Sequence, residues 1–225
     1  GKYYSPQYGK FSSDGSMLVV TDETKGLLQI VDPVAGKVTG SVELEGAPQG
    51  LAWTAEGTVL VAEYDNATVA EVDPKAEKVL RRIDTRMKPY GVAVAEGKGL
   101  MVVTNFGRNT VSLIDLASGE SKAELGVGRQ PFLVAVTPDE KTAVVTNVLP
   151  VGPASDPDVG SEVSLIDLDT LSVSKSIKLL DGSSNVRDVV ISPDGKWAYV
   201  AHTRGRVALP TTQLERGWMN TNALT

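Results

Sequence analysis

The segment Val-Val-Thr-Asn occurs twice in this chain, and looser copies of it recur at nearly constant spacing. The full copies are residues 102–105 and 144–147, and the looser ones are 19–22, 61–64 and 200–202. Equivalent positions in these copies lie 42, 41, 42 and 55 residues apart, at Thr21, Glu63, Thr104, Thr146 and Ala201. Prolines keep the same early spacing, at Pro6, Pro48, Pro89 and Pro131. Two independent markers with one period indicate an array of structural repeats.

The best-defined repeat reads as four short strands separated by turn residues. Apolar and β-branched runs alternate with glycine-containing turns, and the expected strands are residues 91–94, 100–104, 111–115 and 120–125. Solenoids of similar period are helical, and the density of Val, Thr and Ile argues against helix. The period and strand content predict an all-β fold, a β-propeller of four-stranded antiparallel blades. Trp53 and Trp197, in or beside the first two strands of their blades, are expected in the core.

The repeat predicts one propeller domain over residues 1–225, with blades starting near residues 8, 50, 91, 133 and 188. Four blades are complete in this sequence, and the fifth is expected to reach only its third strand. A seven-bladed propeller, the expected complete form, would need about 294 residues at this period. The sequence therefore predicts an incomplete propeller, completed by a further segment or another chain, because an open sheet edge invites unwanted pairing.

Composition excludes several classes of function. The formal net charge of −6 and the pI near 4.9 argue against a nucleic-acid partner, which selects basic surfaces. No apolar run approaches the roughly 18 residues of a membrane span. The chain has no cysteine, which excludes disulfides, thiolate nucleophiles, cysteine-ligated zinc and covalent c-type haem attachment within it. No Gly-x-Ser-x-Gly or His-Glu-x-x-His pattern occurs, so no catalytic residue is predicted and a non-enzymatic chain is favoured.

Two insertions, residues 148–160 and 203–222, lengthen the same connection in the fourth and fifth blades. In a four-stranded antiparallel blade, this second-to-third loop lies on the same side as the start of the first strand. Long loops on one side of a rigid scaffold are where binding usually occurs. The face predicted to bind a ligand or partner comprises Tyr8, Gln49, Tyr90, Arg129, Phe132, Arg187, His202, Arg204, Arg206, Arg216 and Trp218. Its arginines would suit an anionic partner, or would pair with loop carboxylates.

Acidic residues on the same face offer two candidate metal sites. Asp22 and Glu63 end their strands and could hold a cation near the axis or act as an acid and base, but capping of the neighbouring turn explains them more simply. Asp156 and Asp158 resemble part of a calcium loop that lacks its third acidic position, and a surface turn is the alternative. His202 is the only histidine, with a ligand role or a capping hydrogen bond as its two interpretations.

The motifs resemble one known family. The Val-Val-Thr-Asn copies, residues 109–115 (NTVSLID) and residues 192–201 (SPDGKWAYVA) look like the YVTN β-propeller repeat of bacteria and archaea. Residues 209–224 resemble an insertion in YVTN propellers that accompany c-type cytochrome or di-haem peroxidase-like modules. This resemblance implies a periplasmic or cell-surface location and a redox partner that carries haem, with no cofactor in this chain.

Three functions follow as expectations. The first is an exported, non-enzymatic propeller that binds a protein or surface ligand through its insertion-bearing face. The second is a redox accessory domain that packs against a c-type cytochrome or di-haem peroxidase module. The third is a lactonase-like hydrolase that uses Asp22, Glu63 or His202 around a metal. Fold resemblance alone does not choose among them, because propellers host all three kinds of activity.

Overall fold

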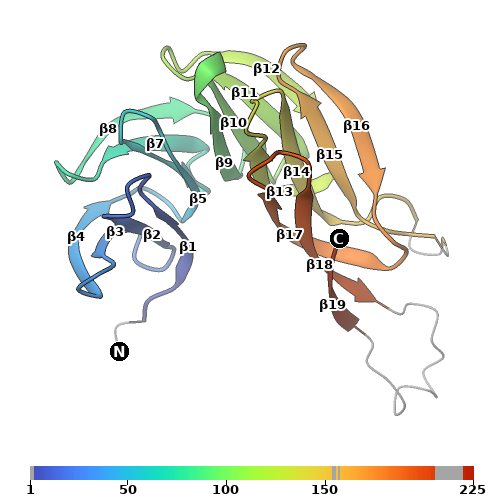
Figure 1. Cartoon of the computed structure of the whole chain (residues 1–225), viewed down its shortest axis with the longest axis horizontal. Coiled ribbons are helices and arrows are strands. Elements are labelled where there is room, and N and C mark those ends of the chain that lie inside the picture. The colour runs from blue at the N-terminus through green and yellow to red at the C-terminus, as the bar shows by residue number, and fades with distance from the viewer. Residues whose placement is uncertain (1–2, 154–155, 157, 206–219) are drawn as a thin grey trace. The chain divides into compact units, whose positions relative to one another are not determined.

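The computed structural model describes residues 3–153, 156, 158–205 and 220–225 (Figure 1). Within these residues it contains 19 β-strands and one 3-10 helix, η1 (Glu96–Lys98). The chain divides into two compact units. The N-terminal unit comprises residues 1–108 and 112–124, and the C-terminal unit comprises residues 109–111 and 125–225. No helix in the described part of the chain is long and apolar enough to cross a membrane.

The N-terminal unit holds blades 1 to 3, each a four-stranded antiparallel sheet whose strands follow one another in sequence. Blade 1 is β1 (Pro6–Phe11), β2 (Leu18–Asp22), β3 (Leu27–Asp32) and β4 (Lys37–Glu43). Blade 2 is β5 (Pro48–Trp53), β6 (Val59–Glu63), β7 (Thr68–Asp73) and β8 (Lys78–Asp84). Blade 3 is β9 (Pro89–Ala95), β10 (Leu100–Asn105), β11 (Thr110–Asp115) and β12 (Ser121–Gly126), the last strand ending in the other unit.

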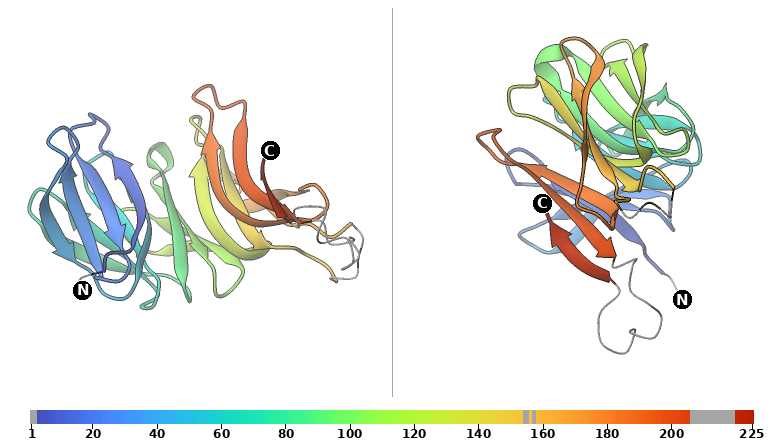
Figure 2. Two further views of the ribbon diagram at one scale, coloured as in Figure 1. Left: turned by 90° about the horizontal axis from the view of Figure 1, so that it is seen from below. Right: turned by 90° about the vertical axis from the view of Figure 1, so that its right-hand side faces the viewer.

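The C-terminal unit holds blades 4 and 5. Blade 4 is β13 (Arg129–Val136), β14 (Thr142–Leu149), β15 (Glu162–Asp167) and β16 (Ser172–Lys178). Blade 5 is β17 (Ser183–Ile191), β18 (Ala198–Gly205) and β19 (Asn220–Leu224), at the red end of the colour bar in Figure 2. The four-stranded blades predicted by the repeat are confirmed. Each first strand begins a few residues before the predicted start of its blade.

In each of these blades, the marker proline of the first strand pairs with a residue of the repeated segment in the second strand. Pro6 pairs with Asp22, Pro48 with Glu63, and Pro131 with Asn147. A register shift follows each of these prolines along its strand. Proline has no backbone N–H to donate, so it suits the end of a strand ladder beside such an irregularity. The shared period of the markers follows from this pairing.

This pairing corrects the predicted phase of blade 2. Glu63 occupies the position of Asp22, not that of Thr21, and Ala62 stands where blades 1, 3 and 4 have threonine. That threonine links the first two strands, because its hydroxyl oxygen accepts a hydrogen bond from a backbone N–H of the first strand. The accepted donors are Tyr8 for Thr21 and Gly91 for Thr104, at 3.1 and 2.7 Å. Alanine cannot accept this bond, so blade 2 lacks it at Ala62.

Burial follows the stacking of sheets. Every residue of β6 and β10 is buried, so both faces of these strands are covered. Blades 1 and 2 share one apolar cluster that includes Val19, Leu28, Val59 and Val61. The expectation that Trp197 lies in the core is wrong, because 65% of it is exposed, whereas Trp53 packs against the cluster of blades 1 and 2. Trp197 lies on blade 5, the last sheet described.

The insertions are partly strand. β14 continues to Leu149, and a bridge joins Val151 to Gly160 beyond it. In blade 5, Thr203 pairs with Asn222 and Gly205 with Asn220, so both ends of the predicted insertion 203–222 belong to a hairpin. The antiparallel ladder satisfies backbone groups that a free loop would leave to water. The third strand of blade 5 accordingly begins at Asn220, earlier than the predicted start near Ala223.

A Ser/Thr-x-Asp turn joins the first two strands in three blades. The hydroxyls of Ser12, Thr137 and Ser192 each donate to the aspartate two residues later at 2.6 Å. In the first turn, the hydrogen bond from Ser12 and those from Ser16 lower the pKa of Asp14 from 3.8 to about 2. These bonds stabilise the ionised carboxylate and fix the hairpin.

We predict that the carboxyl carbon of Asp14 titrates near pH 2 by NMR and moves back toward 3.8 in Ser12→Ala. Because the folded pKa is depressed, the contribution of this group to stability is fully present above the unfolded pKa of 3.8 and is lost as pH falls toward 2. A titration near 3.8 in both proteins would contradict the turn geometry.

Candidate functional site

Four aromatic side chains meet on one face of the N-terminal unit. The ring centroids of Tyr8 and Tyr90 are 6.0 Å apart and those of Tyr64 and Tyr90 are 5.9 Å apart, both in edge-to-face geometry. Phe106 lies 6.1 Å from Tyr64 and 5.9 Å from Tyr90. All four are half-buried. We call Tyr8, Tyr64, Tyr90 and Phe106 the aromatic cluster.

The blade topology gathers these rings from three sheets. Tyr8 and Tyr90 lie near the starts of β1 and β9, the first strands of blades 1 and 3. Tyr64 and Phe106 directly follow β6 and β10, the second strands of blades 2 and 3. In each blade the start of the first strand pairs with the end of the second, so these positions share one side of the sheets. This is the face on which the sequence predicts binding.

Sequence reasoning found two members of the cluster and missed two. Tyr8 and Tyr90 were predicted for this face, and the structure brings them together, with their hydroxyl oxygens 3.4 Å apart. Tyr64 and Phe106 were not predicted. The signal was their position directly after the strand-ending residues Glu63 and Asn105. A search of that position in each repeat would have found both.

Two lysines lie over tyrosine rings of this unit, one of them a ring of the aromatic cluster. The Lys88 ammonium lies 4.9 Å from the centre of the Tyr64 ring, and the Lys25 ammonium lies 5.5 Å from that of Tyr4. A cation over an aromatic face is attracted by the negative potential of the ring. Exposed carboxylates are present too, including Asp65 beside Tyr64. The face of this unit is therefore aromatic at its centre and mixed in charge around it.

Gln49, predicted for the same face, is buried at the start of β5 and only 3% exposed. Its side-chain oxygen has no hydrogen-bond partner among the described residues. The next residue, Gly50, comes so close to blade 3 that a Cβ there would lie 2.5 Å from the Tyr90 carbonyl oxygen. The inner strands of blades 2 and 3 therefore touch directly beneath Tyr90.

The predicted face residues of the C-terminal unit lie on its own blades. The Arg187 guanidinium lies 5.2 Å from the centre of the Phe132 ring, joining blades 4 and 5. Arg129 and Arg204 donate to backbone carbonyl oxygens, those of Pro150 and Asp181. No ion pair joins these three arginines to a carboxylate in the described part of the unit. Arg206, Arg216 and Trp218 lie outside the described residues.

Glu63 is a fully buried carboxylate whose partners all come from its own chain. Its oxygens accept hydrogen bonds from the Thr68 hydroxyl at 2.7 Å, the Glu45 N–H at 2.8 Å and Arg82 at 3.0 and 3.3 Å. Its side chain is 0% exposed and that of Arg82 is 31% exposed. The hydrogen bonds to Glu63 raise the pKa of Arg82, so the guanidinium stays charged. These contacts use the lone pairs that a metal would need.

Asp22 also serves the turn beside it. One carboxylate oxygen accepts the backbone N–H groups of Ser5 and Lys25, each at 3.1 Å. The equivalent amides reach the next strand, with Asn105 donating to Ser112 and Asn147 to Ser164. The contacts of Asp22 fit turn capping, whereas the two asparagines bond a serine of the neighbouring strand.

His202 completes this series in blade 5. Its Nε2 lies 2.9 Å from the Thr225 hydroxyl, and the residue is 5% exposed. The other ring nitrogen has no partner among the described residues. In the second candidate metal site, Asp156 accepts the backbone N–H of Asp158 at 2.9 Å, as in an ordinary turn. No three acidic or histidine side chains converge as metal ligands anywhere in the described ranges.

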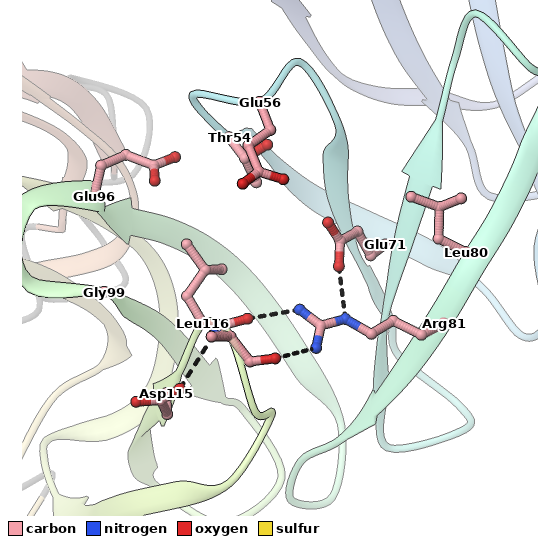
Figure 3. A pocket seen from close by; sticks show the side chains of 10 residues that line it. Thr54, Glu56, Glu71, Leu80, Arg81, Glu96, Gly99, Asp115 and Leu116 are labelled. Atoms are coloured by element: carbon pink, nitrogen blue, oxygen red, sulfur yellow. Dashed lines mark hydrogen bonds and ion pairs between the residues drawn. The ribbon is translucent and has the colours of Figure 1, made fainter.

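A cleft of about 520 Å³ lies between blades 2 and 3 of the N-terminal unit (Figure 3). Its lining includes Glu56, Glu96 and Asp115. Arg81 crosses it, pairing with Glu71 at 2.7 Å and donating to the carbonyl oxygens of Leu116 and Ala117 at 2.6 Å. Arg81 thereby ties the outer strand of blade 2 to blade 3. Sequence analysis did not predict this cleft.

The four-stranded antiparallel blades, with their strands in sequence order, define the chain as a β-propeller. No family model matches the sequence. The chain is 31% identical over 118 residues to hydrazine synthase subunit beta of Kuenenia stuttgartiensis, covering 52% of this chain and 29% of that protein. It matches the solved structure of Kuenenia stuttgartiensis hydrazine synthase with a TM-score of 0.88 and 27% identity, covering 98% of this chain and 62% of that one. The chain thus spans less than two thirds of either relative.

Proposed function

We propose that this chain is the propeller part of a subunit in a multi-protein assembly, and that it docks a protein partner through the face that carries the aromatic cluster. The observation that carries the proposal is the collection of four half-buried rings, from three blades, on that face. Half-buried tyrosines offer large contact area with few rotatable bonds, and tyrosine is enriched at the energetic centres of protein interfaces.

The similarity to hydrazine synthase subunit beta supports the assembly. That relative is by name one subunit of an enzyme, and the aligned region includes about half of this chain. In our proposal the propeller binds a partner and catalyses no reaction. The candidate acid–base residues support this role, because the carboxylates of Glu63 and Asp22 already accept hydrogen bonds from Arg82 and from the backbone of Ser5. We therefore favour a non-enzymatic role for this chain over the lactonase-like alternative.

The proposal has two further parts, which concern the kind of partner and the cellular compartment. We propose a periplasmic or cell-surface location and a partner of the c-type cytochrome or di-haem peroxidase kind. This rests on the YVTN-like repeats and on residues 209–224, which lie largely outside the described structure. Haem would reside in the partner or in a further segment of the polypeptide, because these 225 residues have no cysteine to attach c-type haem covalently.

The test uses the native preparation. Polypeptides that co-purify with the protein from its source are identified, and the absorbance spectrum of the complex is recorded. The redox form of the proposal predicts a haem band that travels with the propeller through successive columns. A co-purifying partner without haem would retain the docking role and remove the redox role. A protein that purifies alone would contradict both.

We predict that Tyr64→Ala and Tyr90→Ala each weaken binding of the identified partner by about 30-fold, the roughly 2 kcal/mol typical of interface hot spots. Tyr90→Phe should bind within a few-fold of wild type, because it keeps the ring. The matched control is Val34→Ala, at a turn position that is 94% exposed. Affinity is measured by calorimetry, with unfolding midpoints recorded for each variant. Unchanged affinity in both alanine variants would show that the partner binds elsewhere.

A further inference from the structure

A buried side-chain amide beside the aromatic cluster has an oxygen without a hydrogen-bond donor. Gln49 is the second residue of β5 and is 3% exposed, and its side-chain oxygen has no partner among the described residues. Most buried polar groups in proteins are paired, because a buried acceptor without a donor loses its hydration and gains nothing in exchange. Gln7, which also follows the marker proline of its blade, is exposed and donates to Glu23 at 2.6 Å. Gln49 differs from it in holding a buried acceptor that no described residue satisfies.

Two tyrosines of the aromatic cluster meet across the strand that carries Gln49. β5 packs against β1 of blade 1 and against β9 of blade 3. Tyr8 of β1 and Tyr90 of β9 nevertheless contact each other, with ring centroids 6.0 Å apart and hydroxyl oxygens 3.4 Å apart. Their contact therefore spans the start of β5, which fits the low exposure of Gln49. The hydroxyl contact is longer than the roughly 2.7–2.8 Å usual for O–H···O hydrogen bonds, so it is a weak link between the two rings.

The chain contains examples of what such rings hold. Tyr90 and Phe132 each directly follow the marker proline of their blade, so they occupy equivalent positions. The Arg187 guanidinium lies 5.2 Å from the centre of the Phe132 ring. In the aromatic cluster itself, the Lys88 ammonium lies 4.9 Å from the centre of the Tyr64 ring. The rings at these positions attract cations, and a guanidinium also stacks flat on a ring and carries five N–H donors.

We propose that the docking partner inserts an arginine side chain between Tyr8 and Tyr90, and that the Gln49 side-chain oxygen accepts a hydrogen bond from its guanidinium. The inference rests on the docking role proposed above and identifies the group that this face recognises. A guanidinium meets both features of the site, because its flat face suits the rings and its N–H groups suit the buried oxygen. Gln49 thereby determines specificity. A partner without such a donor would leave the oxygen buried and unpaired.

The first test uses the 225-residue chain and a small probe, N-acetyl-arginine amide, followed by NMR. We expect the probe to shift the ring resonances of Tyr8 and Tyr90 and the side-chain amide resonances of Gln49. Gln49→Leu should bind the probe about 10-fold more weakly, as expected for the loss of one hydrogen bond to a charged group. Its unfolding midpoint should stay equal or rise, because the substitution removes an unpaired buried acceptor of similar volume.

Two controls separate charge and position from the hydrogen bond. N-acetyl-citrulline amide has nearly the same shape without the charge, and it should bind about 5-fold more weakly than the arginine probe. Gln7→Leu changes the exposed glutamine at the equivalent position of blade 1 and should leave probe affinity unchanged. Equal probe affinity in Gln49→Leu and the wild type would overturn the proposal. A lowered unfolding midpoint with unchanged probe binding would also overturn it, because the oxygen would then be paired with an internal water only.

The second test uses the identified partner. Gln49→Leu should weaken its binding by about 10-fold, whereas Tyr90→Phe keeps the ring and should bind within a few-fold of wild type. The docking role fails on its own if Tyr64→Ala and Tyr90→Ala both leave the partner bound with unchanged affinity. If those two variants weaken binding and Gln49→Leu does not, the docking face stands and the inserted arginine is overturned.

Discussion

Replacing Arg82 with methionine is expected to lower the free energy of unfolding by about 3 kcal/mol or more, the typical cost of removing one partner of a buried ion pair. Glu63 is 0% exposed, and two of its four hydrogen bonds come from this guanidinium. The substitution leaves a carboxylate in the core of blade 2 without its counter-charge. Urea unfolding monitored by tryptophan fluorescence gives the measurement.

The double variant Glu63→Gln/Arg82→Met separates charge from packing. It should recover most of the loss, because a neutral amide costs far less to bury than an unpaired carboxylate. The control is Arg86→Met, which removes an exposed pair with Glu124 and should cost less than about 1 kcal/mol. Equal losses in Arg82→Met and Arg86→Met would show that Glu63 is not the buried, paired group described here.

Replacing Gly50 with alanine is the second substitution with a large expected effect. The added methyl would lie 2.5 Å from the Tyr90 carbonyl oxygen and 3.1 Å from the Gly91 Cα, both backbone atoms that cannot swing aside. Blades 2 and 3 must therefore separate, and we expect a loss of about 2 kcal/mol or more, at the upper part of the range for overpacking. The same shift should move Tyr90 and weaken partner binding.

The matched control is Gly126→Ala, at a position where a Cβ would meet nothing within 4 Å. It should change the free energy of unfolding by less than about 0.5 kcal/mol, and alanine in a strand end carries little cost of its own. If Gly50→Ala were as stable as Gly126→Ala, the inner strands of blades 2 and 3 would not be in contact.

The fold could be predicted from the repeat because the two markers, the prolines and the Val-Val-Thr-Asn segments, pair with each other in each blade. Pro48 and Glu63 belong to one cross-strand pair, so the spacing of either follows from the blade. The phase error in blade 2 arose where Ala62 replaces the threonine that accepts an inner-strand N–H elsewhere. The exposure of Trp197 was missed because local pattern shows that a strand has an apolar face, not whether another sheet covers it.

The candidate site was only half predictable. Tyr8 and Tyr90 could be placed on the proposed docking face by topology alone. Tyr64 and Phe106 meet Tyr90 only after three sheets stack, and no local pattern in the sequence reports a contact between different blades. The role of Glu63 depends likewise on Arg82, which lies 19 residues away on β8. Such partners are set by the three-dimensional packing of strands.

Hydrogen exchange of the propeller, free and bound to its co-purified partner, tests the central claim most directly. We expect slowed exchange in the segments that carry the aromatic cluster, residues 6–9, 63–66, 88–91 and 105–108. The hairpins at the other end of the strands, residues 12–16, 54–57 and 96–99, should exchange alike in both states. Protection confined to those hairpins, with the cluster segments unchanged, would contradict the docking face.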